Sequence, residues 1–193
     1  MNVSSPPLIK GSPDRPIFIM SLVQAGQEQV KKICCLGAGY VGGPTSAVIA
    51  AQCPDIQVTV VDLSESRVEA WNSGNLPVKE PFLDEFVAKS LNVNLWFTTN
   101  AKAAIEEAEI IFISVNTPTK EYGLGAGSAS DLSAVFGAAR LILEHAEDDK
   151  IIVMKSTVPV GTCALVSKFM NSRGMVKFTI LSNPEFLAEG TAI

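Results

Sequence analysis

The chain has 193 residues, of which 47% are hydrophobic and 18% are charged, and its formal net charge is −5. This length suits one domain with a full core, or one domain plus the start of another, and the composition is typical of a globular protein. An acidic balance without a basic stripe argues against nucleic acid as a partner, and no apolar stretch is long enough to cross a membrane.

The first 29 residues differ from the rest in composition. Their first half contains Pro6, Pro7, Pro13 and Pro16, which discourage regular structure. We predict a disordered extension over residues 1–29 and one folded domain over residues 30–193. The short apolar run from Ile17 to Val23 leaves a signal peptide as the alternative, but we favour an extension on a cytoplasmic protein.

A short apolar run, Ile33–Leu36, ends at a glycine-rich turn and is followed by small residues. The pattern predicts a buried parallel strand that leads into a helix. Gly37 permits the tight turn, Gly39 lets the backbone approach a pyrophosphate, and Gly42 lets the helix pack on the strand. The turn therefore predicts a dinucleotide site at the start of a helix, where unpaired N–H groups face the phosphates.

A second apolar run, Val58–Val61, ends in Asp62, which lies 23 residues after Gly39. That carboxylate is placed to accept hydrogen bonds from an adenosine ribose. Arg67, in the early turns of the next helix, would lie near the same end of the cofactor; the alternative is a solvated helix charge. A tight turn beside an unrelated surface Asp would also explain the pattern, but the complete strand, helix and acid favour the dinucleotide site.

Strand and helix signals then alternate to the end of the chain. Further strands are predicted at Leu95–Thr98, Ile110–Val115, Ile151–Met154 and Phe178–Leu181. Helices are predicted from Ser64 as a cap to about Asn72, over Phe82–Leu91, over Ala101–Ala108 after Asn100 as a cap, from Leu132 to about Glu144 after Asp131 as a cap, and over Ala164–Met170. Repeated βα units with short links predict an α/β fold of the Rossmann type, a doubly wound parallel sheet with helices on both faces.

Four cysteines and one histidine, His145, give no spacing typical of a metal site. Cys34 and Cys35 are adjacent on a strand, so we expect them to point to opposite faces as small apolar fillers. Reduced thiols, including Cys53 and Cys163, fit a cytoplasmic protein.

Three stretches follow predicted strands directly and combine polar side chains with a proline. They are Asn116–Lys120, Ser156–Pro159 and Asn183–Gly190. Turn chemistry alone explains any one of them. Because ligands bind at the carboxyl ends of such strands, all three together favour a functional edge.

Glu185 and Glu189 are carboxylates at this edge, four residues apart. They would share one face if Pro184 opens a helix. A carboxylate near a nicotinamide could act as a general base or orient a water; the alternative is a pair of glutamates that favour a helix N-terminus.

Five motifs together resemble the UDP-glucose 6-dehydrogenase family, over Lys31 to Ile193. They are the glycine turn with Tyr40 and Gly43, Val60-Val61-Asp62, Ser114–Thr119, Lys155–Pro159 and Asn183–Leu187. Ile33-Cys34-Cys35 and Ala188–Ile193 resemble the eukaryotic branch in particular.

The resemblance implies an NAD-dependent oxidation of UDP-glucose to UDP-glucuronate in two steps, with two NADH formed. It implies NAD contacts at Gly37, Ala38, Gly39, Tyr40, Val41, Gly42, Asp62, Arg67, Val115, Asn116, Thr117, Pro118, Thr119, Ser156, Thr157, Val158 and Glu189. The position of Thr157 is implied to order the catalytic water, and that of Glu185 to act in acid–base and hydrolysis steps. Sugar contacts are implied for Glu185, Phe186, Leu187, Ala188 and Glu189.

The sequence departs from the family pattern after Ile193, where the central helix and the UDP-binding domain are expected. None of the four cysteines matches the family's nucleophile, so we expect little or no turnover from these 193 residues alone. The resemblance implies a homo-oligomer for the full-length family chains and leaves the state of this chain open. A dehydrogenase of UDP-N-acetylmannosamine or GDP-mannose remains an alternative, as does a non-catalytic NAD-binding module; NADP is disfavoured by the charge of Asp62.

Overall fold

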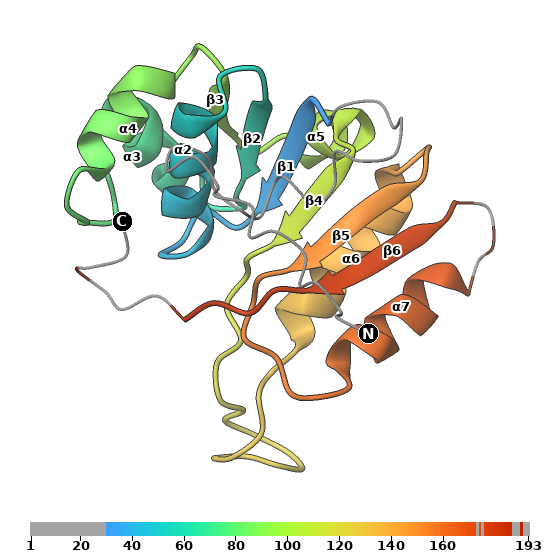
Figure 1. Ribbon diagram of the computed structural model, residues 1–193. Coiled ribbons are helices and arrows are strands. Elements are labelled where there is room, and N and C mark those ends of the chain that lie inside the picture. Colours follow the sequence, from blue (N-terminus) through green and yellow to red (C-terminus); the bar gives the residue numbers. More distant parts are fainter. Residues whose placement is uncertain (1–29, 173, 175, 187–189, 191–193) are drawn as a thin grey trace, which may run out of the picture.

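The computed structural model describes residues 30–172, 174, 176–186 and 190. They form a six-stranded sheet in the order β3-β2-β1-β4-β5-β6, and every neighbouring pair is parallel (Figure 1). The strands are β1 (Lys32–Leu36), β2 (Gln57–Val61), β3 (Leu95–Thr98), β4 (Ile110–Ile113), β5 (Lys150–Met154) and β6 (Phe178–Ser182). The predicted doubly wound α/β fold is confirmed. The predicted extension over residues 1–29 lies outside the described residues.

Six helices occur in the described part of the chain. They are α2 (Gly42–Gln52), α3 (Glu65–Ser73), α4 (Leu83–Ser90), α5 (Ala101–Glu107), α6 (Ser133–His145) and α7 (Thr162–Asn171). The predicted caps Ser64 and Asn100 are confirmed, because their side-chain oxygens accept the N–H groups of Arg67 and Ala103.

Several predicted boundaries differ from the observed ones by one or two residues, and two of these differences have a local cause. The N-cap of α6 is Leu132, although the carboxylate of Asp131 still accepts the N–H of Ser133 in the first turn. Strand β4 ends at Ile113 and not at Val115, because the carbonyl of Val115 leaves the ladder and accepts the hydroxyl of Ser156.

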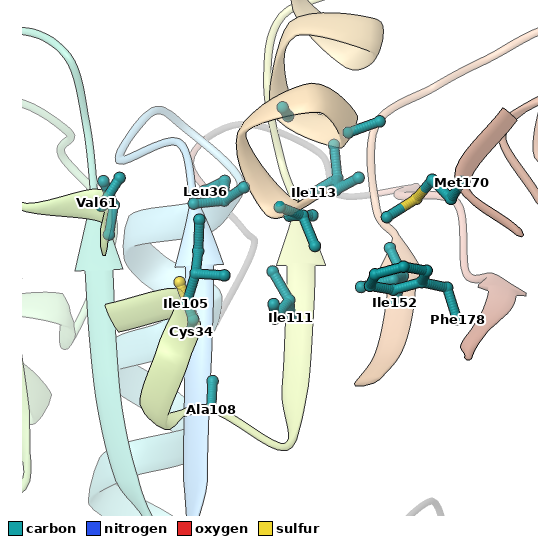
Figure 2. Close-up of a cluster of buried hydrophobic side chains, with 14 of the residues drawn as sticks. Cys34, Leu36, Val61, Ile105, Ala108, Ile111, Ile113, Ile152, Met170 and Phe178 are labelled. Atoms are coloured by element: carbon teal, nitrogen blue, oxygen red, sulfur yellow. The ribbon is translucent and has the colours of Figure 1, made fainter. Parts of the chain in front are cut away.

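Each face of the sheet buries its own hydrophobic core. One core contains Cys34 and is covered by α5, α6 and α7 (Figure 2); the other contains Cys35 and is covered by α2, α3 and α4. Period-two alternation along β1 sends the two cysteines to opposite faces, as predicted. Burial raises the pKa of both thiols, so both are protonated apolar fillers at neutral pH.

Strands β1 and β4 are neighbours, yet the chain leaves β1 towards α2 on one face and leaves β4 towards α6 on the other. Their carboxyl ends therefore diverge, and this divergence opens a crevice at the switch point of a doubly wound sheet. No helix in the described part of the chain is long and apolar enough to span a bilayer. No group of three His, Cys, Asp or Glu side chains that could hold a metal occurs among the described residues.

Candidate dinucleotide site

A pocket of about 570 Å³ lies at the carboxyl ends of β1, β2 and β4. It is lined by six residues predicted for cofactor binding, namely Gly37, Gly39, Asp62, Arg67, Val115 and Asn116. Helix α6 supplies a further wall of small and apolar side chains: Ala134, Gly137, Ala138 and Leu141. This wall was not predicted. The volume is within the ordinary range for a cofactor site.

The fold leaves no room for a side chain at two glycines of the turn, Gly37 and Gly42, but leaves room for one at Gly39. At Gly37, φ is +107°, and a Cβ there would collide with the carbonyl of Ser114. A Cβ at Gly42 would collide with the carbonyl of Gly37. A Cβ at Gly39, in contrast, would meet no atom within 4 Å, so the fold itself does not require glycine at this position. Gly39 also lines the pocket, so a phosphate that approached its backbone would meet no side chain at this residue.

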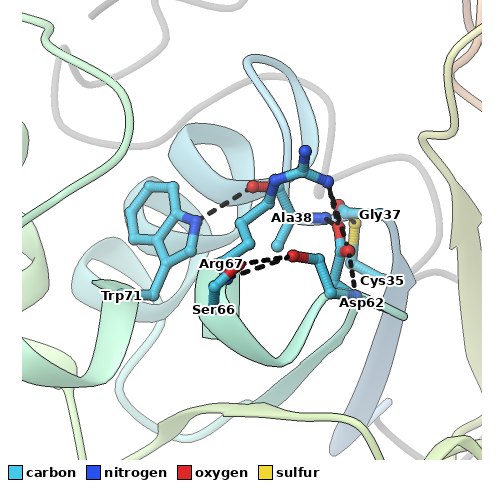
Figure 3. A network of polar contacts seen from close by, with 8 residues as sticks. Cys35, Gly37, Ala38, Asp62, Ser66, Arg67 and Trp71 are labelled. Atoms are coloured by element: carbon cyan, nitrogen blue, oxygen red, sulfur yellow. Dashed lines mark hydrogen bonds and ion pairs between the residues drawn. The ribbon is translucent and has the colours of Figure 1, made fainter. Parts of the chain in front are cut away.

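Asp62 is the centre of the polar network at this end of the pocket (Figure 3). Its carboxylate accepts the N–H of Ala38 at 2.8 Å and the N–H of Ser64 at 2.9 Å. The guanidinium of Arg67 donates to both carboxylate oxygens, at 3.2 Å and 3.0 Å. Burial alone would raise the pKa of Asp62, but the hydrogen bonds from Ser64, Ala38 and Arg67 outweigh it and hold the pKa below its usual value. The residue is therefore an anion at neutral pH.

The Arg67 side chain occupies acceptor positions on Asp62 that a bound ribose would need. A carboxylate has about four acceptor positions, and Ala38, Ser64 and the two Arg67 contacts use that number at Asp62. The two backbone donors are fixed by the turn and by the start of α3, whereas the Arg67 side chain is 43% exposed. The hydroxyl groups of a bound ribose would therefore compete with Arg67 for Asp62, and Arg67 is the donor exposed enough to give way.

The start of α2 offers backbone donors to the same pocket. Among the described residues, no hydrogen bond uses the N–H groups of Gly39, Tyr40, Val41 or Gly42. The N-cap residue Val41 supplies no side-chain cap that would compete for them. Free N–H groups and the positive end of the helix dipole suit a pyrophosphate. The residues present thus fit NAD, with Asp62 for the ribose and the α2 start for the phosphates.

Hydroxyl groups connect the loops that follow β4 and β5. The Ser156 hydroxyl donates to the carbonyl of Val115 at 2.7 Å and lies 3.2 Å from that of Ile113. The Thr117 hydroxyl donates to the carbonyl of Thr157 at 2.7 Å. The structure thus brings the predicted residues Val115, Thr117, Ser156 and Thr157 together. Val158 packs against the core formed by α5, α6 and α7.

An ion pair connects the loops that follow β5 and β6. Lys155 Nζ lies 2.8 Å from Glu185 Oε2, and both side chains are nearly buried, with exposed fractions of 13% and 12%. Glu185 was predicted as a site residue, but Lys155 was singled out only as part of a motif. The sequence shows only that each residue comes shortly after a predicted strand end at the same sheet edge; the register of β5 against β6 decides that they meet.

The condition under which Glu185 and Glu189 would share a face, a helix opened by Pro184, is not met over residues 183–186, which have no helical structure. Phe186 is 89% exposed. Leu187, Ala188 and Glu189, also predicted for the site, lie outside the described residues. Gly190 donates its N–H to Glu80, a buried carboxylate that precedes α4 and was not predicted.

Several residues predicted for cofactor binding are not among those that line the main pocket. Pro118 and Thr119 line a separate hollow of about 400 Å³ together with Asp131, and Tyr40 is 59% exposed at the start of α2. One buried contact at the glycine turn was not predicted at all: the Trp71 indole N–H donates to the carbonyl of Ala38.

Comparison with known proteins places this geometry in a family. Residues 31–193 match the UDP-glucose/GDP-mannose dehydrogenase family, NAD binding domain. UDP-glucose 6-dehydrogenase 4 of Arabidopsis thaliana and UDP-glucose 6-dehydrogenase 1 of Glycine max are each 58% identical over 164 residues, which are 84% of this chain and 34% of each relative. The chain spans about a third of the length of the curated relatives it matches.

Solved structures agree with this placement. A UDP-glucose dehydrogenase from Pyrobaculum islandicum superposes with a TM-score of 0.74 at 34% identity, covering 85% of this chain and 38% of that one. A GDP-mannose dehydrogenase from Pseudomonas aeruginosa gives 0.73 at 30% identity, covering 83% and 37%. Both the predicted family and NAD as the cofactor are confirmed. The chain belongs to the UDP-glucose/GDP-mannose dehydrogenase family, of which residues 31–193 are the NAD-binding domain.

Proposed function

We propose that this chain supplies the NAD-binding domain and the first substrate loop for the oxidation of UDP-glucose to UDP-glucuronate. The observation that carries the proposal is the position of the Lys155–Glu185 pair, which follows β5 and β6 at the same sheet edge as the dinucleotide pocket. The identity of 58% to UDP-glucose 6-dehydrogenases supports this sugar nucleotide over related ones.

In the proposed reaction, the C6 alcohol becomes a carboxylate, one water is taken up and two NAD⁺ are reduced. Bound NAD⁺ supplies the hydride acceptor. The Glu185 carboxylate would accept a proton from the C6 hydroxyl or from the attacking water, and Lys155 would hold that carboxylate in place at 2.8 Å. Thr157, whose carbonyl is fixed by the Thr117 hydroxyl, would place its own hydroxyl on the water.

A cytoplasmic location is part of the proposal. Its support is that Cys34, Cys35, Cys53 and Cys163 are all free thiols. Homo-oligomerisation is proposed only for the whole protein of which such a domain is part.

The test is a chimera in which residues 30–193 replace the matching 164 residues of the Arabidopsis relative. We expect two NADH per UDP-glucose, no NADH from GDP-mannose or UDP-N-acetylmannosamine, and a loss of at least 100-fold in kcat for Glu185→Gln. Oxidation of GDP-mannose in preference to UDP-glucose would replace the proposed substrate.

A second measurement distinguishes the proposed oxidation from the non-catalytic alternative. It is a calorimetric titration of the 193-residue chain with NAD⁺ and NADP⁺. Saturable binding that prefers NAD⁺ and loses that preference in Asp62→Ala is expected. If the chain binds NAD⁺ in this way but the chimera is inactive, the domain is a binding module and the proposed oxidation is refuted.

A further inference from the structure

We infer that Trp71 is a positioning residue for the pyrophosphate, because its indole N–H sets the orientation of the Ala38–Gly39 peptide. This inference rests on dinucleotide binding and is independent of the proposed sugar oxidation. Trp71 lies on α3, outside the glycine turn, and its side chain is fully buried.

Both neighbouring peptides of the turn are held from inside the protein. The Ala38 N–H donates to Asp62 at 2.8 Å, and the Ala38 carbonyl accepts the Trp71 indole N–H at 2.9 Å (Figure 3). A buried carbonyl needs such a partner, and no other hydrogen bond to the Ala38 carbonyl occurs among the described residues.

Because a peptide unit is planar, the contact between Trp71 and Ala38 also fixes the direction of the Gly39 N–H. The carbonyl of Ala38 and the N–H of Gly39 belong to one peptide unit, and the structure contains no cis peptide among the described residues. In a trans unit the two groups point in opposite directions. Because Trp71 holds the carbonyl in the interior, the Gly39 N–H points outward, where Gly39 lines the pocket and has open space.

The Trp71 ring is itself held in a fixed place. It stacks on Phe97 with ring centroids 4.7 Å apart and planes 6° from parallel. Its six-membered ring lies against Gly43, where an added Cβ would collide with it. The indole is thus wedged between β3 and the start of α2, and it cannot turn away from Ala38.

The experiment compares three ligands on the 193-residue chain and its Trp71→Phe variant. Phenylalanine keeps an aromatic ring over Phe97 but has no N–H. We expect Kd for NAD⁺ and for ADP-ribose, which carry the pyrophosphate, to rise about tenfold, or about 1.4 kcal/mol. Kd for adenosine, measured by NMR titration, should change less than twofold, because adenosine carries no phosphate.

Two outcomes would overturn the inference. An equal loss of affinity for all three ligands would mean that Trp71 merely packs the domain. No loss of affinity for any ligand would mean that the peptide keeps its orientation without the indole.

The chain offers a matched control, because its only other tryptophan, Trp96, is one residue from Phe97 on β3. Trp96→Phe makes the same chemical change without touching Ala38 and should leave all three Kd values unchanged. Phe97→Leu removes the stacking partner but leaves the indole N–H, so it should lower the melting temperature more than it weakens NAD⁺ binding.

If Trp71→Phe does not fold, a measurement on the unmutated chain tests the same orientation of the Ala38–Gly39 peptide. On addition of ADP-ribose, the amide resonance of Gly39 should shift strongly, while the indole N–H of Trp71 should stay protected from hydrogen exchange with and without ligand. A Gly39 amide that is unmoved by ADP-ribose, or an indole N–H that exchanges freely, would contradict the inference.

Discussion

Two regions of the sheet edge differ in how they are held. In the first region, the glycine turn with Asp62 and Trp71, buried side chains clamp backbone groups of a tight turn. In the second region, the loops after β4, β5 and β6, hydroxyl groups and one ion pair tie neighbouring loops together. Backbone collisions leave no room for an added atom at Gly37 or Gly42, whereas the side-chain ties of the second region can be removed one at a time. We therefore expect the largest loss of stability at a glycine of the first region and smaller, graded losses in the second region.

The largest effect is expected for Gly37→Ala. The residue has positive φ and its Cβ would collide with the Ser114 carbonyl, so we expect a loss of about 3 kcal/mol or more in the free energy of unfolding. Urea unfolding followed by circular dichroism measures it. Gly39→Ala is the matched control, because the fold leaves space for its methyl group.

Gly39→Ala should keep the stability of the original chain to within about 0.5 kcal/mol and yet weaken NAD⁺ binding severely, because the methyl group would fill the space for the phosphate. If Gly39→Ala binds NAD⁺ normally, the open space at this residue is not a phosphate site. If Gly37→Ala is as stable as the original chain, the turn is more adaptable than its contacts indicate.

In the second region, Lys155→Met should have the largest effect. It leaves the nearly buried Glu185 carboxylate without its ammonium partner, which should cost about 2 kcal/mol of stability. The double variant Lys155→Met with Glu185→Gln removes the charge as well and should recover more than half of the loss, as measured by urea unfolding. Additive losses in the two single variants would show that the pair is not coupled.

A smaller effect is expected for Ser156→Ala, about 1 kcal/mol, because the carbonyls of Ile113 and Val115 lose a nearby hydroxyl donor. Thr117→Val removes an exposed hydroxyl that donates a hydrogen bond of similar length. This change should cost less than about 0.5 kcal/mol of stability. Thermal unfolding of both variants side by side tests the order. A larger loss for Thr117→Val would reverse the assignment of Ser156 as the main tie between these loops.

The same comparison explains what could be predicted from the sequence. The fold and the first region follow local rules: apolar runs of strand length, a glycine turn, an acid after β2 and Ser64 as a cap. The contact of Trp71 with Ala38, 33 positions apart in the chain, could not be predicted, because an aromatic residue on a helix reads equally well as core. The Lys155–Glu185 pair depends on the register of β5 against β6, which no local pattern specifies.

The smallest effect is expected from the titration of Asp62. Its pKa in the folded chain is below the ordinary value of about 3.9, because the hydrogen bonds from Ser64, Ala38 and Arg67 favour the anion. The stability that Asp62 contributes is therefore fully present above the ordinary pKa and is lost as the pH falls through the lower folded value. The difference in free energy of unfolding between the original chain and Asp62→Asn should be constant from pH 5 to pH 7 and should shrink below about pH 4. A difference that stays constant down to pH 2 would mean that the amide accepts the same backbone bonds and that the charge of Asp62 serves the ligand alone.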